Sequence, residues 1–333
     1  MVVSLMLRDT FGRELRDLRI SVTDRCNFGC VYCRATDSPG YLPPTGLLSW
    51  EQLLRVAQAF VRLGTRKIRL TGGEPLLRPG LVEFVARLRN LEGLEDLALT
   101  TNGTLLAGKA RALAAAGLCR VNISVDSIRP ERFASLTQNA VSLPAVLAGV
   151  EAAQEAGLLP VKLNVVLVRG FNDVDILDLV DFARQRQLII RFIEFMPLVG
   201  DDGWSPGRVV TAREIIETIH PVWPLAEIPA SIPYGTARRY RFADGGGEMG
   251  IIAPVSLPFC RACSRMRLTA DGKIRTCLYS REEHDIRALL SNSDGDQELA
   301  QSLMNIVRQK EPRHHINESD FVPPARTMMS IGG

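Results

Sequence analysis

The sequence predicts an α/β protein, an incomplete (β/α)6 TIM-type barrel closed by a smaller C-terminal domain. Short β-branched runs alternate with helical segments up to about residue 196, which predicts one parallel sheet with right-handed crossovers. After residue 200, glycine and proline become frequent and the alternation stops. A closed eight-stranded barrel needs about 250 residues, so an open barrel fits better, and a doubly wound sheet is the alternative. We divide the chain into residues 1–235 and residues 236–333.

Local signals support this alternation. We expect strands at 18–22, 67–71, 96–101, 120–126, 161–168 and 189–196, and helices near 49–63, 79–90, 105–116, 143–156 and 173–186. Ser49 and Gln52 have the spacing of a capping box, and Pro79 suits a first helical turn. Glycines that can end a helix in the left-handed conformation follow three of these segments, at Gly64, Gly117 and Gly157.

After residue 200 we expect short strands and two helices. Thr211 and Glu214 open one helix by the capping-box rule, and another is expected near 296–310. Strands are expected near 237–242, 248–252, 266–269 and 273–277. The last two flank Asp271-Gly272, a hairpin turn signal that would carry Cys277 back toward Cys260 and Cys263.

The composition is that of a soluble globular protein. Of 333 residues, 46% are hydrophobic and 23% charged, and the net charge of +3 is too small to indicate a nucleic-acid-coating protein. The sequence has no secretory signal pattern and no apolar run long enough for a membrane span, so we expect a cytoplasmic protein. In that reducing compartment, clustered cysteines indicate metal binding or catalysis before disulfides.

Six of the seven cysteines form two triplets. Each triplet offers three thiolates where a closed zinc or cubane iron–sulfur site takes four, so each site would leave one coordination position for a small molecule. The alternatives are a structural zinc knuckle at the first triplet and a zinc site completed by His284 at the second. The triplets are Cys26-x3-Cys30-x2-Cys33 and Cys260-x2-Cys263-x13-Cys277.

Other candidates lie at predicted strand ends, where sites form in parallel α/β proteins. Cys26 follows the first strand, and Thr71-Gly72-Gly73-Glu74-Pro75 follows the second, where glycines allow close approach to a ligand. Ser124 and Asp126 end the fourth strand, and Met196 ends the sixth.

Several basic residues fall on predicted strands. Arg265 and Arg267 are two apart and would point to one face, which suits a polyanion such as a triphosphate, although a solvated strand face would look the same. Arg19, Arg69 and Lys162 are also on strands, where an unpaired charge is rare, so they would add to a basic cavity or pair with acids such as Glu194.

The first triplet, with Tyr32 inside it, resembles that of the radical S-adenosylmethionine superfamily. From residue 18 to 333 the chain resembles one family more closely, the molybdenum cofactor biosynthesis protein A family of GTP 3′,8-cyclases. The segments that carry this resemblance are LRISVTDRCNFGCVYC, KIRLTGGEPLLR, TTNGTLL, VNISVDS, VKLNVVLVRGFND, RFIEFMPL, CxxCxRxR…C and the Gly332-Gly333 terminus.

The resemblance implies a role for each candidate residue. Cys26, Cys30 and Cys33 would hold a [4Fe–4S] cluster that cleaves S-adenosylmethionine, and Tyr32, Gly73, Ser124 and Met196 would contact that cofactor. Cys260, Cys263 and Cys277 would hold a second [4Fe–4S] cluster whose open iron meets guanine. The GTP contacts would be Arg19, Arg69, Thr100, Lys162, Arg265 and Arg267, of which Arg265 and Arg267 count as catalytic with the first triplet. Gly332-Gly333 would reach into the active site.

The resemblance also implies the reaction, a carbon–carbon bond-forming lyase step early in molybdenum cofactor biosynthesis. Its implied partners are GTP, an electron donor of flavodoxin type and a downstream cyclic pyranopterin monophosphate synthase, with no membrane or nucleic acid, and the chain would be a monomer or homodimer. One alternative is a radical enzyme that modifies a peptide. Detectable GTP binding would distinguish a GTP cyclase from such an enzyme. Another is an iron–sulfur or zinc regulator, which would need a basic recognition element that the sequence lacks.

Overall fold

The computed structural model describes residues 6–33, 40–138, 142–198, 203–229, 235–291 and 295–332. Its strands are β1 (Asp17–Ser21), β2 (Lys67–Thr71), β3 (Asp96–Thr101), β4 (Arg120–Ser124), β5 (Lys162–Leu167), β6 (Ile189–Glu194), β7 (Leu225–Ile228), β8 (Arg238–Phe242), β9 (Glu248–Ile252), β10 (Arg265–Leu268), β11 (Lys273–Arg275) and β12 (His284–Asp285). The α-helices are α1 (Trp50–Arg62), α2 (Leu81–Arg89), α3 (Ala110–Ala115), α4 (Pro130–Leu136), α5 (Leu143–Glu155), α6 (Ile176–Gln185), α7 (Ala212–Ile219), α8 (Arg287–Ser291), α9 (Asp296–Arg308) and α10 (Met328–Ile331).

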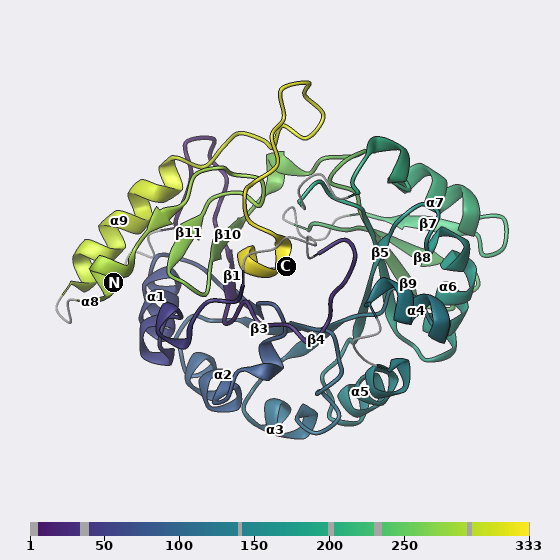
Figure 1. Ribbon diagram of the computed structural model, residues 1–333, viewed down its shortest axis with the longest axis horizontal. Helices are drawn as coiled ribbons and strands as arrows, with labels where there is room; N and C mark the ends of the chain where they lie inside the picture. The colour runs from purple at the N-terminus through teal and green to yellow at the C-terminus, as the bar shows by residue number, and fades with distance from the viewer. Residues whose placement is uncertain are drawn as a thin grey trace.

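The strands form one curled sheet in the order β12-β11-β10-β1-β2-β3-β4-β5-β6-β9-β8-β7. Strands β1 to β6 are parallel, β10 and β9 extend this array in parallel at its two edges, and the outer strands are antiparallel. Figure 1 shows the sheet curled into an open ring, with α1 to α7 outside it and the short helix α10 near its centre. The prediction of an incomplete barrel is therefore confirmed, and the doubly wound alternative is wrong because the helices do not cover both faces.

Most of the helix starts and ends predicted from local sequence signals are present in the structure. Side chains cap α1 at Ser49 and α7 at Thr211 in complete capping boxes. Left-handed glycines follow helices at Gly64, Gly117 and Gly157, with φ of 104°, 93° and 73°. Pro79 is not in a first helical turn, since α2 begins at Leu81 and the Pro79 carbonyl accepts a hydrogen bond from the Trp50 indole at 3.1 Å. The sequence analysis did not anticipate α4, α8, α10, β7 or β12.

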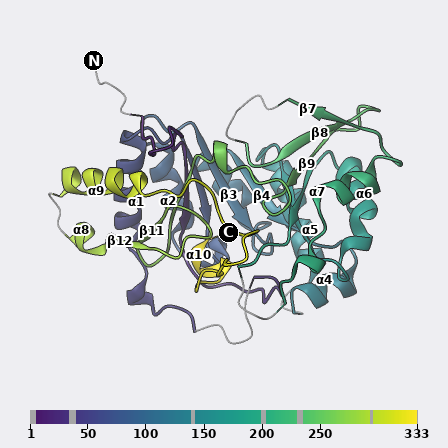
Figure 2. The ribbon, with the colours of Figure 1, turned by 90° about the horizontal axis from the view of Figure 1, so that it is seen from above.

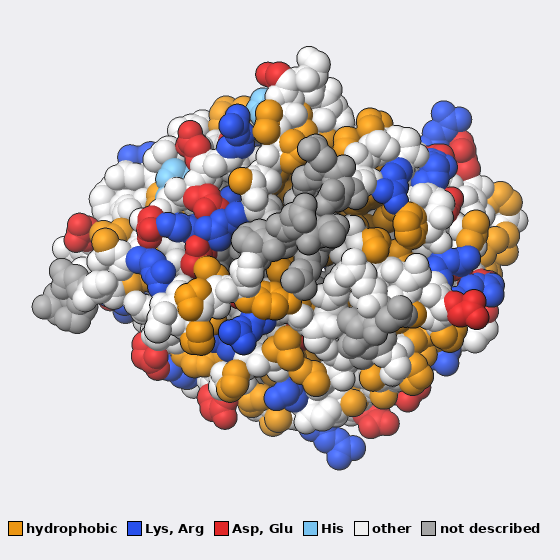
Figure 3. Space-filling model, viewed as in Figure 1, with side chains coloured by type: hydrophobic (Ala, Val, Ile, Leu, Met, Phe, Trp, Pro, Cys, Tyr) orange, Lys and Arg blue, Asp and Glu red, His pale blue; other side chains and the backbone are white. Residues whose placement is uncertain are grey.

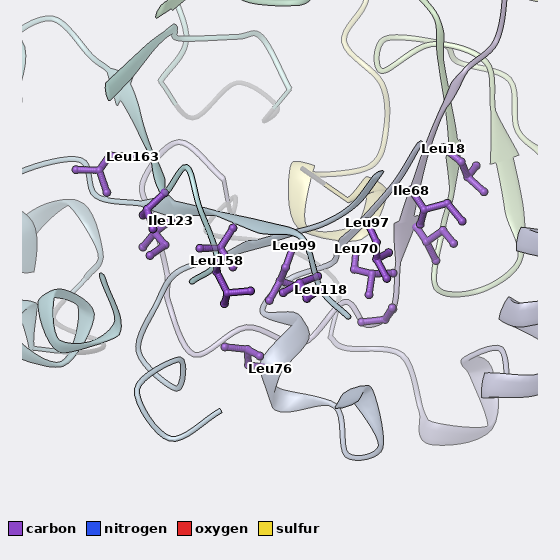
Figure 4. Close-up of a cluster of buried hydrophobic side chains, with 14 of the residues drawn as sticks. Leu18, Ile68, Leu70, Leu76, Leu97, Leu99, Leu118, Ile123, Leu158 and Leu163 are labelled. Carbon is purple, nitrogen blue, oxygen red and sulfur yellow. The ribbon is translucent and has the colours of Figure 1, made fainter. Parts of the chain in front are cut away.

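Side chains alternate between the two faces of the curled sheet. The outward-facing residues are apolar and pack against the helices; Figure 4 shows Leu18, Ile68, Leu70, Leu97 and Leu99 among them. Burying this face fixes which residues point inward, because a one-residue shift in register would exchange the faces. The inward set is polar and lines the site described below.

Charged side chains of both signs lie on the surface of the molecule. Figure 3 shows basic and acidic side chains intermixed around the rim of one face. Over the residues described, the helices are too short or too polar to cross a bilayer.

Replacing a core leucine tests the outer face. Leu99 is fully buried, so Leu99→Ala should lower the free energy of unfolding by about 2–5 kcal/mol through lost burial and the cavity left behind. Anaerobic urea denaturation would measure it. The same change at Leu77, which is 38% exposed, should cost less than about 1 kcal/mol, and equal losses at the two positions would contradict this packing.

Candidate active site

One cavity of about 980 Å³ lies inside the barrel, and both cysteine triplets line it. Apart from His284, every residue proposed from the sequence as a metal ligand, cofactor contact or substrate contact also lines it, although the individual roles remain predictions. These residues are Arg19, Cys26, Cys30, Tyr32, Cys33, Arg69, Gly73, Thr100, Ser124, Lys162, Met196, Cys260, Cys263, Arg265, Arg267 and Cys277.

The first triplet lies in the loop that leaves β1. The Cys33 N–H donates to the Cys30 carbonyl at 2.9 Å, and the Phe28 N–H donates to Cys26 Sγ at 3.4 Å. Burial raises the pKa of Cys26 to about 11 and that of Cys33 to about 12, where the charges of Cys26 and Asp126 add to the effect. All the cysteines are free. Such thiols ionise readily only beside a strong positive charge, which a bound metal supplies.

Gly73, after β2, packs directly against the cysteine loop. A Cβ at this position would lie 2.3 Å from the Arg25 carbonyl oxygen, so only glycine fits. The next residue, Glu74, donates its N–H to that carbonyl at 2.7 Å and accepts a hydrogen bond from the Thr101 hydroxyl at 2.7 Å. The segment therefore fixes the cysteine loop against the ends of β2 and β3.

Tyr32 is held by an acid that follows β4. Its hydroxyl donates to Asp126 Oδ2 at 2.5 Å, and Asp126 Oδ1 accepts from the Val166 N–H at 2.8 Å. Ser124 ends β4 and Met196 follows β6, so the proposed cofactor contacts gather at the carboxyl ends of the parallel strands. The sequence indicated the strand-end position of Asp126 but not its contact with Tyr32.

The second triplet lies at the opposite end of β1, because β10 runs parallel to β1 and Arg265 is level with Asp17. The β10–β11 hairpin returns Cys277 beside Cys263, as predicted. Burial alone would raise the pKa of Cys263, but the charges of Arg265 and Lys310 and hydrogen bonds from Arg265 lower it to about 6. His284, the possible fourth zinc ligand, lies on β12 and does not line the cavity.

The donor set suits clusters better than single ions. In the described ranges, no three His, Cys, Asp or Glu side chains converge on a position for one metal ion. A cubane cluster needs no such convergence, since each thiolate binds a separate iron. Three free thiols facing a common volume, twice in one cavity, fit that requirement.

Positive charge fills the middle of the cavity. Strand register places Arg267, Arg19 and Arg69 side by side on β10, β1 and β2. Lys162 and Arg191 extend the row on β5 and β6. Within the residues described, none of these five forms an ion pair with a carboxylate. The acids at this end, Asp17 and Asp96, instead pair with Lys67 and Arg120.

This crowding perturbs the cations themselves. Burial and neighbouring cations, chiefly Arg191, lower the pKa of Lys162 to about 7. Burial and neighbouring arginines likewise lower the pKa of Arg69 to about 9 and hold that of Arg19 well below its ordinary value. An anion in the cavity would relieve this repulsion, so the site favours a ligand with several negative charges.

Four buried polar atoms that line the cavity have no hydrogen-bond partner among the described residues: Asn122 Oδ1, Arg191 Nε, Tyr279 OH and His314 Nε2. Because buried polar atoms are normally paired, the residues that carry them are candidates for contact with a substrate or cofactor. Sequence reasoning missed all four. Strand alternation could have found Asn122 and Arg191, whereas Tyr279 and His314 lie in irregular segments without a periodic signal.

Of the two alternatives that the sequence left open for the strand cations, a basic cavity and pairing with Glu194, the second is wrong, because Glu194 is bound by backbone N–H groups. It is fully buried at the end of β6. Its carboxylate accepts hydrogen bonds from the Ala212 N–H at 3.0 Å and from the Val255 and Ser256 N–H groups at 2.9 Å. Glu194 thus joins the barrel to α7 and to the loop that leads to the second triplet.

The C-terminal segment enters the same ring, where Figures 1 and 2 show α10 near its centre. The Gly332 carbonyl accepts a hydrogen bond from Arg267, and the Met329 N–H bonds to the Cys33 sulfur. Gly332 has φ of +90°, and a Cβ there would lie 2.9 Å from Ser21 Cβ, so glycine is required. The predicted entry of the tail is present at Gly332; Gly333 lies outside the described residues.

An ion-pair clasp anchors this tail. Arg326 donates to both Asp271 oxygens, at 3.0 and 2.8 Å, and its Nε lies 2.9 Å from Glu283 Oε1. Asp271 belongs to the β10–β11 turn, so the hairpin that carries Cys277 also holds the tail.

Comparisons with known proteins agree with this geometry. The profile of the Radical SAM superfamily matches residues 20–183, and that of Molybdenum Cofactor Synthesis C matches residues 188–316. A GTP 3′,8-cyclase from Acidothermus cellulolyticus is 48% identical over 316 residues, covering 92% of this chain and 87% of that protein. Another, from Pelotomaculum thermopropionicum, is 43% identical over 330 residues, covering 98% and 100%. The chain belongs to the GTP 3′,8-cyclase family.

Solved structures share the fold of this cyclase-family chain. Streptococcus suis SuiB bound to S-adenosylmethionine matches with a TM-score of 0.60 at 12% identity, over 92% of this chain and 76% of SuiB. Methylornithine synthase (PylB) matches with a TM-score of 0.53 at 16% identity, over 94% and 84%. Membership in the radical SAM superfamily implies one [4Fe–4S] cluster and S-adenosylmethionine binding.

Breaking the clasp in this family member should release the tail. Arg326→Gln removes a partly buried, charged hydrogen-bonded pair, which should stabilise the docked tail by about 1.5–3 kcal/mol. Without it, the undocked tail should become roughly ten- to a hundredfold more populated. Carboxypeptidase digestion followed by mass spectrometry would report a faster loss of C-terminal residues. Arg313→Gln, which breaks an exposed pair with Glu318, is the control; equal digestion rates for the two variants would contradict the anchoring role.

Proposed function

We propose that this chain cyclises GTP to (8S)-3′,8-cyclo-7,8-dihydroguanosine 5′-triphosphate, an early step of molybdenum cofactor biosynthesis. The single observation that carries the proposal is the row of cations that lines one cavity between the two cysteine triplets and that has no carboxylate partner among the described residues. Family membership supports the same reaction, since the relatives are GTP 3′,8-cyclases.

The first triplet serves S-adenosylmethionine. Cys26, Cys30 and Cys33 would hold the first [4Fe–4S] cluster, which with the bound cofactor supplies a hydrogen-abstracting 5′-deoxyadenosyl group. Tyr32, Gly73, Ser124 and Met196 would orient that cofactor. The Tyr32–Asp126 hydrogen bond keeps this face of the cavity fixed.

The second triplet serves the base of GTP. Cys260, Cys263 and Cys277 would hold a second [4Fe–4S] cluster, with guanine at its open position. The low pKa of Cys263 supports this, because only thiolates bind iron. Along β1 the two triplets are separated by a strand of five residues, which spans roughly 16 Å, enough for a nucleotide between them.

The cations hold the triphosphate and ribose. Arg19, Arg69, Thr100, Lys162, Arg265 and Arg267 would contact GTP, joined by Arg191 with its unpaired Nε. Fixing the phosphates orients C3′ toward the first triplet and excludes water from the reacting centre. The 3′ hydrogen leaves, a bond forms between C3′ and C8, and one electron and one proton complete a product that is an isomer of GTP.

Further proposals follow from the reaction. It consumes electrons, which a flavodoxin-type donor would deliver, and a cyclic pyranopterin monophosphate synthase would use the product. We retain the division into residues 1–235 and 236–333, a cytoplasmic location, and a monomer or homodimer.

Isotope transfer tests the reaction. The anaerobically reconstituted, reduced protein should convert GTP carrying deuterium at C3′ to an isomer, and the deuterium should move into 5′-deoxyadenosine, as read by mass spectrometry. Cys277→Ala should still cleave S-adenosylmethionine, because the first triplet is intact, but should not cyclise GTP. If the wild type cleaves S-adenosylmethionine but leaves GTP unchanged, the protein is a radical enzyme and the assignment of GTP as its substrate is wrong.

Lys162 makes GTP binding pH-dependent. Its pKa near 7 in the free protein should rise when a triphosphate binds, so binding above pH 7 takes up a proton. GTP affinity should then fall as the pH rises from about 7 to about 9, by at most about tenfold per pH unit for this group. Calorimetry across this range would measure it, with Lys162→Met expected to flatten the profile. An unchanged slope in that variant would contradict the assignment.

A further inference from the structure

A buried lysine lies behind the second triplet. Lys310 follows α9 and is only 3% exposed. Its Nζ donates to the carbonyls of Thr276 and, at 3.0 Å, Arg265. These residues stand next to Cys277 and two residues after Cys263, so one ammonium group ties together the backbone segments that present two of the three thiols. Lys310 does not line the cavity and cannot touch a substrate there.

The charge of Lys310 has no carboxylate partner in the described part of the chain. The adjacent acid, Glu311, instead accepts a hydrogen bond from the Thr276 hydroxyl at 2.8 Å. Burying an ammonium without a counter-ion is costly. The cysteines nearest to these contacts are Cys263 and Cys277, because Lys310 binds the backbone two residues after the first and one residue before the second.

Arg13 holds the third cysteine from the other end of the chain. It is 8% exposed, and its Nη1 donates to the carbonyls of Cys260 at 2.9 Å and Pro312 at 3.0 Å. Its charge is matched by Asp9, 2.5 Å from Nε. Arg13 therefore fixes the backbone without leaving a free charge, whereas Lys310 contributes both contacts and an unmatched charge.

We infer that Lys310 is a positioning residue and the counter-charge of the second metal centre. It holds Cys263 and Cys277 in place, and its positive charge stabilises the thiolates and raises the reduction potential of the cluster they hold. This inference rests on the proposed function, which assigns a [4Fe–4S] cluster to Cys260, Cys263 and Cys277.

The full-length chain with Cys26, Cys30 and Cys33 replaced by alanine isolates the second triplet. In this background, Lys310→Met removes charge and contacts, and Lys310→Gln keeps a donor but removes the charge. The readouts are iron retained against a chelator and the cluster potential from a redox titration followed by electron paramagnetic resonance. Lys273→Met is the matched control, because Lys273 lies on β11 and already pairs with Asp285.

Lys310→Met should weaken iron binding by roughly ten- to a hundredfold, the usual cost of losing an outer-shell partner. Lys310→Gln should retain more iron but shift the potential to more negative values, a change that a merely structural residue would not cause. The control should match the parent in both. Circular dichroism checks folding. If Lys310→Met does not fold, the reduction potential of the cluster in Lys310→Gln alone tests the inference.

Parent-like iron binding and potential in both Lys310 variants would overturn the inference. So would an unshifted potential in Lys310→Gln, because the charge would then have no effect. If the parent chain itself binds no cluster at the second triplet, the two-cluster part of the proposed function fails. This result differs from the two outcomes above, in which the parent binds a cluster and the Lys310 variants behave like it.

Discussion

The uncompensated positive charge inside the barrel is the constraint on which the rest of the structure depends. Arginines and lysines with lowered pKa values occupy inward strand positions where most proteins place apolar side chains. Their mutual repulsion must be offset by the apolar packing of the outer face of these strands, part of which Figure 4 shows. The cavity thus suits a ligand with several negative charges, which would offset this repulsion.

The open barrel explains how the two cysteine triplets can lie at opposite ends of one cavity. Because β10 joins β1 in parallel, its leading cysteines lie at the end of β1 opposite to the loop of the first triplet. A closed barrel would have placed all sites at one rim. The antiparallel β10–β11 hairpin then supplies Cys277, and the tail enters over the first triplet, so a different group of thiols lies at each end of the cavity.

The sequence predicted the barrel strands because their outward residues must be apolar at every second position, and it predicted the cysteines because their spacing is specific. It could not predict partners that depend on three-dimensional contact. From its place on a strand, Glu194 could be a counter-ion for the strand cations. In the structure its carboxylate instead accepts hydrogen bonds from backbone N–H groups far along the chain. Lys310 follows an ordinary amphipathic helix, and nothing in its neighbours signals its burial beneath the second triplet.

The turn at Asp271-Gly272 illustrates a hazard for protein engineering. Its backbone needs only Gly272, with φ of +83°, and a short polar residue before it, so asparagine would satisfy the turn as well as aspartate does. Yet the carboxylate of Asp271 also accepts both hydrogen bonds from Arg326 that hold the C-terminal tail. A design procedure that scores hairpins by local turn preference would treat the two residues as interchangeable and would unknowingly loosen a segment that docks in the active-site cavity.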